Sequence, residues 1–391
     1  MENSLIFEDF INSKPLYYKE IDHQRVHHAY KMIQSHIRRP LIVHIVGTNG
    51  KGSTGRVMAT LLHCAGKRVG HFSSPHILKF NERIWIEGED ISDKALDEAH
   101  STLYALLGRD MSESLSYFEY TTLLAFVATQ KMDVLVLEAG LGGEFDATNV
   151  VKKELSVITP IGLDHQAFLG NTIEEISRTK LNSVEEKALL ALQPSSTVYR
   201  VADEIAKEKK SVFYRVEIED YRRLCAESPD MNWAEYLYEN ATLATKALDI
   251  LELPYNLNDL KKVKLFGRFY EIAPNVTIDV GHNLLATEAL VKAIEKKHKK
   301  EKIILVYNAL DDKDYEAILR LFKPLIKWVE IIDIDTNRAV KKRDLVNILD
   351  KLEIEYRRFE AVKTRNHYLI FGSFYVVEAF LKKTKDSIKN K

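Results

Sequence analysis

A glycine-rich turn between an apolar run and an amphipathic stretch constrains the fold more than any other part of the sequence. The turn is Gly47-Thr48-Asn49-Gly50-Lys51-Gly52-Ser53. Before it, Leu41–Val46 is apolar and β-branched apart from His44, which predicts a buried strand. After it, residues 53–65 predict a helix that ends at Gly66, a favourable C-terminal cap. A strand, a tight glycine turn and a helix in this order indicate an α/β sheet with the turn at its edge.

This turn has the composition of a phosphate-binding loop. Glycines let backbone N–H groups point at a phosphate, and the helix N-terminus adds a favourable field. We expect Lys51 to meet the β- and γ-phosphates of a nucleotide and the Ser53 hydroxyl to ligate Mg²⁺. The spacing departs from GxxxxGK[ST], because Gly52 separates the lysine from the serine. Taken alone, the turn is also compatible with an ordinary glycine-rich loop.

Two further side chains are candidate metal ligands. Mg²⁺ usually takes one or two carboxylates, and ligands gather beyond the carboxyl ends of strands in open α/β sheets. Glu138 follows the predicted strand 133–137, and His165 follows the next one. The alternatives are a surface acid for Glu138 and a structural histidine for His165.

The rest of the chain alternates short apolar runs with amphipathic stretches, the pattern of an α/β protein with a largely parallel sheet. We place a domain boundary near residue 265, which gives domains 1–265 and 266–391 of ordinary size. Further predicted strands are Val69–Phe72, Leu155–Ile158, 276–280, 302–310 and 329–334, and further predicted helices are 120–130 and 240–251.

Charge and cysteine content exclude several classes of protein. The chain has 391 residues, with 56 Lys and Arg against 57 Asp and Glu, so a broadly basic nucleic-acid binder is excluded. The most hydrophobic long stretch, 123–141, contains charged residues, so we expect no membrane span. Two cysteines cannot build a disulfide framework, and the acidic N-terminus lacks the features of a signal peptide. We therefore expect a cytoplasmic protein, and nothing in the sequence demands more than a monomer.

Additional motifs follow in order along nearly the whole chain. They are Ser74-Pro75-His76 with Phe80-Asn81-Glu82-Arg83-Ile84, Phe118-Glu119, Glu138-Ala139-Gly140-Leu141-Gly142-Gly143, Asp146-Ala147-Thr148-Asn149, Asp164-His165 with Leu169-Gly170, Gly267-Arg268, Asp279 with Gly281-His282-Asn283, Asp312-Lys313-Asp314 and Phe371-Gly372-Ser373. Together with the turn, this set resembles the folylpolyglutamate synthase/dihydrofolate synthase family, a branch of the Mur-type ATP-dependent ligases. The resemblance implies an N-terminal P-loop domain with a mostly parallel sheet. It also implies a smaller, Rossmann-like C-terminal domain that closes over ATP and binds glutamate.

The resemblance also implies a reaction in folate biosynthesis and one-carbon metabolism. The carboxylate of dihydropteroate or of a reduced folate takes the γ-phosphoryl group of ATP, and L-glutamate then attacks the acyl phosphate. The site must exclude water, which would hydrolyse this intermediate. The cofactor is Mg²⁺, expected as two ions, and the partners are these small molecules, with no nucleic acid and no membrane.

By resemblance, site residues fall into four groups. Expected to act in catalysis are Lys51, Lys180 and His282. Expected to bind ATP are Thr48, Asn49, Gly50, Lys51, Gly52, Ser53, Asn240, Arg268, Asp279 and His282. Expected to ligate metal are Ser53, Ser74, Glu138, His165 and Lys180. Expected to bind the folate or pteroate are Ser74, Pro75, Phe80, Arg83, Phe118 and Asp146.

Physical chemistry supports some of these roles and leaves others open. A pteridine ring calls for an aromatic platform and an acceptor carboxylate, which suits Phe118 and Asp146, although Phe118 is also compatible with ordinary core packing. Arg268 can offer a planar donor fork to a phosphate, and a solvated hinge charge is its alternative. In related enzymes the lysine at position 180 is carbamylated by CO₂, which supplies hard oxygen ligands to a second Mg²⁺. A solvated lysine is the alternative for Lys180.

Two segments depart from the family pattern. The family's Glu-Lys-Ala-Gly-Ile is Thr179-Lys180-Leu181-Asn182-Ser183 here, and Leu284 replaces the proline of the Asp-Gly-Ala-His-Asn-Pro motif. Two rival functions share some of these motifs. A cell-wall Mur ligase would need a UDP-binding domain, and nothing resembles one ahead of residue 41. A P-loop switch that only hydrolyses nucleotide would not need the second-domain motif.

Overall fold

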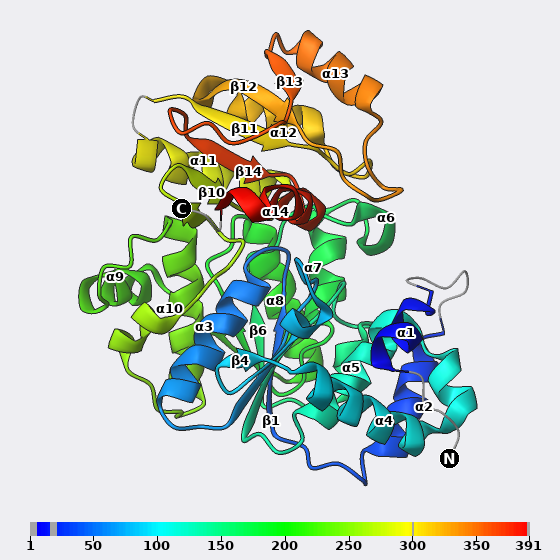
Figure 1. Cartoon of the computed structure of the whole chain (residues 1–391). Helices are drawn as coiled ribbons and strands as arrows, with labels where there is room; N and C mark the ends of the chain where they lie inside the picture. Colours follow the sequence, from blue (N-terminus) through cyan, green and yellow to red (C-terminus); the bar gives the residue numbers. More distant parts are fainter. Residues whose placement is uncertain (1–5, 16–21, 299–300, 389–391) are drawn as a thin grey trace. The chain divides into compact units, whose positions relative to one another are not determined.

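The computed structural model describes residues 6–15, 22–298 and 301–388, which form two compact units (Figure 1). Unit 1 contains the described residues up to Met231 together with Glu239–Val263, and unit 2 contains Asn232–Tyr238 and the residues from Lys264 onward. The short segment 232–238 therefore packs with unit 2, although it precedes residue 265. Within the described parts of the chain, every helix is too short or too polar to span a membrane.

Unit 1 is built on an eight-stranded sheet in the order β4-β3-β2-β5-β1-β6-β7-β8. All neighbours are parallel except the antiparallel pairs β2–β3 and β3–β4. After β1 the chain builds β2 to β5 on one side of it and β6 to β8 on the other, so β1 is the topological switch point where such sheets bind ligands. The strands are β1 (Leu41–Val46), β2 (Val69–Phe72), β3 (Ile84–Ile86), β4 (Glu89–Asp90), β5 (Val134–Glu138), β6 (Leu155–Ile158), β7 (Lys187–Leu190) and β8 (Val212–Arg215).

The helix after the glycine turn begins earlier than predicted. Helix α3 runs over Lys51–Cys64, because Gly50 takes the left-handed conformation (φ 88°) and caps its start. The predicted stop at Gly66 is confirmed, since this glycine follows the helix with φ 84°. Helix α3 packs on β1, β2 and β5, so the start of the helix lies above the middle of the sheet.

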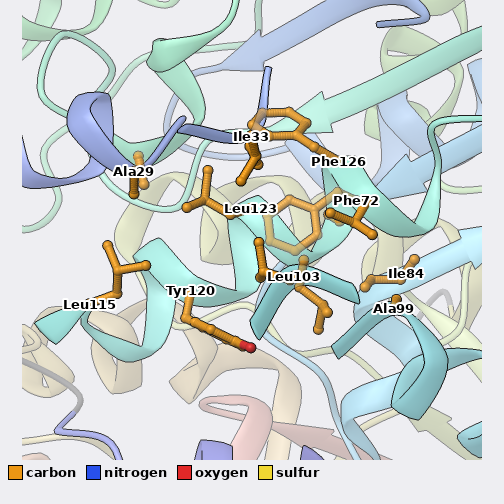
Figure 2. Close-up of a cluster of buried hydrophobic side chains, with 14 of the residues drawn as sticks. Ala29, Ile33, Phe72, Ile84, Ala99, Leu103, Leu115, Tyr120, Leu123 and Phe126 are labelled. Carbon is orange, nitrogen blue, oxygen red and sulfur yellow. The ribbon is translucent and has the colours of Figure 1, made fainter. Parts of the chain in front are cut away.

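Helix α5 packs in a hydrophobic cluster with other helices and with strands of the sheet. It begins at Tyr117 rather than at the predicted residue 120. Ser116 caps α5, its hydroxyl accepting from the N–H of Glu119 while Glu119 bonds back to the N–H of Ser116. In Figure 2, Leu123 and Phe126 of α5 lie among side chains from α2, α4 and the strands. The helices of unit 1 are α1 (Phe7–Asn12), α2 (His23–Ile33), α3, α4 (Asp93–Ser114), α5 (Tyr117–Ala128), α6 (Gln166–Leu169), α7 (Ile173–Leu181), α8 (Ser196–Lys209) and α9 (Ile218–Glu227), with 3₁₀ turns η1 (Phe80–Arg83), η2 (Ala147–Val150) and η3 (Leu257–Lys262).

Helix α10 (Glu235–Ile250) starts five residues before the predicted helix 240–251, so its first turn belongs to unit 2 and the remainder to unit 1. Unit 2 has a six-stranded sheet in the order β13-β12-β11-β14-β10-β9, parallel except for β9. Its elements are β9 (Tyr270–Ala273), β10 (Val276–Ile278), α11 (Leu284–His298), β11 (Ile303–Tyr307), α12 (Tyr315–Phe322), η4 (Lys323–Leu325), β12 (Ile326–Ile331), α13 (Lys342–Lys351), β13 (Tyr356–Arg358), β14 (Tyr368–Phe371) and α14 (Phe374–Ile388).

The strands predicted in this unit exist, but their bounds differ. The predicted strand 329–334 begins at Ile326 and ends at Ile331, because residues beyond Ile331 leave the ladder with β11. At the edge of the sheet, all three residues of β13 are exposed. The core lies between the sheet and its helices and is aliphatic and aromatic, with Phe322 and Phe371 fully buried.

Candidate active site

The glycine turn lies at the carboxyl end of the central strand and is held by the segment after β6. The N–H groups of Thr48 and Asn49 donate to the Pro160 carbonyl at 3.0 and 3.4 Å. The Thr48 hydroxyl donates to the Gly162 carbonyl and accepts from the Gly162 N–H, both at 3.1 Å. These bonds fix the backbone of the turn between two adjacent strands.

Two lysines converge on one carbonyl oxygen of the turn. Lys51 Nζ donates to the carbonyls of Gly47 and Thr48 at 3.3 and 3.2 Å, and Lys180 Nζ donates to the carbonyl of Gly47 at 2.9 Å. Lys180 is 4% exposed, which excludes the alternative of a solvated lysine. Burial, and next the nearby charge of Lys51, lower the pKa of Lys180 from 10.5 to about 7.

Oxygen atoms suited to a hard cation lie beside the start of α3. Glu138 ends β5 next to β1, is 4% exposed, and accepts from the Ser74 N–H at 3.2 Å. A Cβ atom on Gly52 would lie 3.3 Å from Glu138 Oε2, so the carboxylate faces the first turn of the helix. The Ser53 hydroxyl is buried without a hydrogen-bond partner among the described residues. A buried hydroxyl beside a buried carboxylate fits Mg²⁺, whereas the surface-acid alternative for Glu138 does not fit its burial.

His165 differs from the other candidate ligands. It is half-buried, adopts a left-handed conformation (φ 52°) and caps α6, and its N–H donates to Asp164 Oδ1 at 2.9 Å. No cluster of three or more His, Cys, Asp or Glu side chains placed for a metal occurs in residues 6–15, 22–298 and 301–388.

Asp146 is buried in the loop after β5, where its carboxylate accepts hydrogen bonds from two backbone segments. Oδ2 accepts from the Leu141 N–H at 2.8 Å, and Oδ1 accepts from the N–H of Thr148 at 3.0 Å and from its hydroxyl at 2.5 Å. Burial raises the pKa of Asp146, and the hydrogen bonds from Leu141 and Thr148 oppose that rise. The hydroxyl oxygen of Thr148 also lies 2.8 Å from His44 Nε2.

The aromatic and basic candidates for folate binding lie on η1 and α5. Arg83 is buried, donates from Nε to His76 Nδ1 at 2.8 Å, and lies over the rings of Phe80 and Tyr117. Burial, and next the charge of Arg83, lower the pKa of His76 to about 4.

Two further candidates, Phe118 and Pro75, differ in their surroundings. Phe118 is partly buried against the core of α5, and a Cβ atom on Gly140 would lie 2.5 Å from its ring. It therefore touches both the core and the glycine-rich loop, and Pro75 is exposed.

Asn240 reaches the glycine turn from α10. It is 5% exposed, and a Cβ atom on Gly50 would lie 2.4 Å from its Oδ1 atom. Only glycine fits at position 50, since the site combines a positive φ with this close approach.

In unit 2, Asp279 follows β10 and is 5% exposed. Its Oδ2 accepts from the Tyr236 hydroxyl at 2.7 Å and from the Phe269 N–H at 2.8 Å, and Oδ1 accepts from the Gly281 N–H at 2.7 Å. Burial, and next the charge of Asp279, raise the pKa of Tyr236 well above its usual value.

The other two candidates of unit 2 lie on two segments that a backbone bond joins, from the Val280 N–H to the Gly267 carbonyl at 2.9 Å. His282 Nδ1 lies 3.1 Å from the Val280 carbonyl. Arg268 donates to the Gly267 carbonyl at 3.1 Å and lies over the ring of Phe374, so it packs within unit 2 and is not a fully solvated charge.

Sequence reasoning did not single out His44, Thr148 or Tyr236 as functional side chains. His44 was visible only as the one polar residue in an apolar strand, and its contact with Thr148 spans 104 positions of sequence. Tyr236 lies in the first turn of α10, ahead of the predicted start of that helix. Because these residues contact partners far away in the sequence, no local sequence pattern indicates the contacts.

Comparison with known proteins gives a consistent result, although no family model matches the chain. The dihydrofolate synthase/folylpolyglutamate synthase of Buchnera aphidicola (subspecies Schizaphis graminum) is 31% identical over 364 residues, which cover 86% of each chain. The crystal structure of Helicobacter pylori folylpolyglutamate synthetase is 38% identical, covers 97% of this chain and 98% of that one, and has a TM-score of 0.78.

A third match includes a nucleotide analogue and a metal. The bifunctional folylpolyglutamate synthase/dihydrofolate synthase of Yersinia pestis, solved with AMPPNP and a Mn ion, is 26% identical over 96% of each chain with a TM-score of 0.80. The matches span both units and support an ATP-dependent ligase that uses a divalent metal. By sequence identity and coverage, this chain belongs to the dihydrofolate synthase/folylpolyglutamate synthase family.

Proposed function

We propose that this protein joins L-glutamate to dihydropteroate, and also to reduced folates, with ADP and phosphate as the other products. One observation carries the proposal: the glycine turn after β1 lies against Glu138 at the end of β5, with Lys51 and Lys180 on the Gly47 carbonyl. Phosphoryl transfer needs positioned cations and hydrogen-bond donors more than covalent chemistry by the protein. The turn supplies both, at the switch point of the sheet.

The proposed first step transfers the γ-phosphoryl group of ATP to the substrate carboxylate. Lys51 would move from its present carbonyl partners to the β- and γ-phosphates, where its charge offsets the charge that develops in the transition state. The second step is attack by the glutamate amine on the acyl phosphate, with phosphate as the leaving group. Backbone N–H groups of the turn and of the α3 N-terminus hold the anions in place.

We propose two Mg²⁺ ions, held by Ser53, Ser74, Glu138, His165 and a carbamate formed on Lys180. When bound, the ions neutralise charge on the transferring phosphoryl group. Carbamate formation needs a neutral amine, and the burial of Lys180 lowers its pKa to about 7, which favours that form. The hard oxygens of a carbamate would then replace a cation that repels the metal.

On the folate side, we propose that Asp146 accepts from the pterin edge and that Phe118 packs on the flat ring. The carboxylate is held in place by the N–H of Leu141 and by the N–H and hydroxyl of Thr148, with the N–H of Gly140 also facing it. We propose that Ser74, Pro75, Phe80 and Arg83 complete this part of the site.

We propose that the second domain, 266–391, contributes Arg268, Asp279 and His282 to ATP binding and also binds glutamate. Asp279 would hold the ribose hydroxyls and Arg268 a phosphate. In the first domain, 1–265, Asn240 and the residues from Thr48 to Ser53 complete the set. We propose that the protein acts as a cytoplasmic monomer.

The experiment measures phosphate release from ATP with dihydropteroate and glutamate added singly and together. We expect release only when both are present, with the glutamylated product detected by mass spectrometry. Release with ATP alone would instead identify a nucleotide-hydrolysing protein. Release with a UDP-sugar peptide in place of dihydropteroate would identify a cell-wall ligase.

A further inference from the structure

A buried polar chain links Asp146 to β1, the strand that precedes the glycine turn. Its members are Asp146, Thr148 and His44, which are 7%, 0% and 0% exposed. Asp146 Oδ1 and the Thr148 hydroxyl are 2.5 Å apart, and the same hydroxyl is 2.8 Å from His44 Nε2. Because these groups are buried, each hydrogen bond orients its partners.

The protons in this chain can be assigned by counting donors. A threonine hydroxyl has one proton, and an ionised carboxylate can only accept, so Thr148 donates to Asp146. The contact between Thr148 and His44 then requires a proton on His44 Nε2. His44 is neutral, since burial lowers its pKa well below 6.5. The imidazole is therefore the Nε2–H tautomer, with Nδ1 unprotonated.

Stability alone does not explain a histidine at this position. The other five residues of β1 are aliphatic, and His44 Nδ1 is buried with no hydrogen-bond partner among the described residues. A buried unpaired nitrogen is unfavourable, whereas an aliphatic side chain would fill the strand without that cost. The imidazole must therefore serve its one polar contact.

We propose that His44 is a positioning residue that, through Thr148, fixes the carboxylate of Asp146 for recognition of the pterin edge. This inference rests on the proposed function. Asp146 Oδ2 is held by the Leu141 N–H, so the two oxygens are anchored to different segments and the carboxylate cannot rotate without breaking one anchor. Without the His44 bond, Thr148 is free to turn its hydroxyl away, and Asp146 Oδ1 then loses one of the hydrogen bonds that orient it.

The first test separates pteroate binding from ATP binding. His44→Leu removes the donor, and we expect the KM for dihydropteroate to rise about tenfold while the KM for ATP stays within about twofold. His44→Gln places an amide N–H near the position of Nε2, and we expect it to restore the KM to within about threefold. Ser156→Ala is the matched control, since Ser156 pairs with His44 across the ladder and its buried hydroxyl has no partner among the described residues.

The second test guards against loss of folding in the leucine variant. Thr148→Val removes the bridging hydroxyl, and Thr148→Ser keeps it, so the valine change should reproduce the His44→Leu effect and the serine change should not. The proposal is overturned if His44→Leu leaves the dihydropteroate KM unchanged, if it raises both KM values equally, or if His44→Gln is as impaired as His44→Leu.

The third test does not depend on activity. Two-bond ¹H–¹⁵N correlation spectra of the ligand-free protein at pH 7, assigned with the His44→Gln variant, should show the Nε2–H tautomer. An Nδ1–H tautomer or an imidazolium would overturn the proton assignment and the proposal with it. If the wild type failed to turn over dihydropteroate, the proposed function would fall, while these spectra would still test the hydrogen-bond chain.

Discussion

The side-chain amino groups of Lys51 and Lys180 converge on one carbonyl oxygen, that of Gly47. Lys51 is half-buried and Lys180 is buried, and burial followed by the charge of Lys51 lowers the pKa of Lys180. No carboxylate forms an ion pair with either lysine among the described residues. Under the proposed function, a bound triphosphate would supply negative charge here, and the turn would need little rearrangement to receive it.

Lys51→Ala should abolish ligase turnover while leaving the fold intact. The change removes the cation that we propose faces the transferring phosphate, and we expect kcat to fall at least about 100-fold. Coupled ADP release measures the rate, and far-ultraviolet circular dichroism checks the fold. Lys94→Ala is the control, because Lys94 is 88% exposed on α4 and should retain full activity. Near-normal turnover in Lys51→Ala would contradict the assignment of the phosphate turn.

Lys180 should make the unfolding free energy depend on pH. In the unfolded chain this lysine keeps its proton up to about pH 10.5, but in the folded chain only up to about pH 7. Between these values the unfolded state binds a proton that the folded state lacks, so wild-type stability rises with pH by up to ~1.4 kcal/mol per unit. Lys180→Met lacks this contribution, so its free energy of unfolding relative to wild type should fall from pH 7 to pH 9.

Urea unfolding in CO₂-free buffer at pH 7, 8 and 9 measures that difference. Lys152→Met is the control, since Lys152 is 65% exposed and its replacement should shift stability equally at each pH. Parallel pH curves for wild type and Lys180→Met would show that Lys180 titrates normally in the folded protein.

At the scale of elements, helix α7 holds the glycine-rich loop through residues that depart from the family pattern. Asn182 donates from its amide to Glu144 Oε2 at 2.8 Å, and the N–H of Glu144 donates to the Thr179 carbonyl at 3.0 Å. A Cβ atom on Gly143 would lie 2.6 Å from the Lys180 carbonyl, so loop and helix are in close contact. The altered segment thus still joins the Lys180 helix to the Asp146 loop.

Two substitutions that exchange the donor and acceptor roles of Asn182 and Glu144 test the hydrogen bond between them. Asn182→Asp sets two carboxylates against each other, and we expect it to lower the free energy of unfolding by about 1 kcal/mol and to raise hydrogen exchange in residues 140–146. Adding Glu144→Gln restores one donor and one acceptor, and should recover most of both effects. If the double variant is no better than Asn182→Asp, the two side chains are not coupled.

Elements with a strong local pattern were predictable, and those set by distant contacts were not. The strands Leu41–Val46, Val69–Phe72 and Leu155–Ile158 have the predicted bounds, because each is buried along its length apart from the half-buried Leu41. Helix α5 starts at a capping box that the hydrophobic pattern alone misses. The edge strand β8 was not predicted, since its residues alternate between exposed and half-buried and give a weak apolar pattern.

The same distinction applies to the candidate site: local motifs were predictable, whereas contacts between distant residues were not. Glycines and a lysine in the phosphate turn have a composition that points directly to their chemistry, and Glu138 follows from its place after a strand. The contacts of Asp146 and Asp279 could not be foreseen, because their donors come from a threonine turn and from Tyr236, whose position depends on tertiary packing. The sequence therefore predicts which candidate side chains are present better than it predicts the hydrogen bonds that orient them.

For the molecule as a whole, two units with separate cores should not unfold as a single cooperative system. The buried clusters of unit 1 and unit 2 share no residue among those described. We expect scanning calorimetry to give a calorimetric enthalpy greater than the van't Hoff enthalpy. ATP with Mg²⁺ should raise the midpoint of at least one transition by mass action. A single transition with equal enthalpies would show that the two units unfold together.

The exposed strand β13 has a consequence for how the protein behaves at high concentration. An open sheet edge is a template on which another chain can pair and start a fibre. Here the edge is only three residues long, and two of the three are arginines: Arg357 lies 3.8 Å over the ring of Trp328, and Arg358 binds Asp333 at 2.9 Å. An incoming strand would have to dislodge these cations. The same short segment that completes the sheet therefore protects the chain against aggregation.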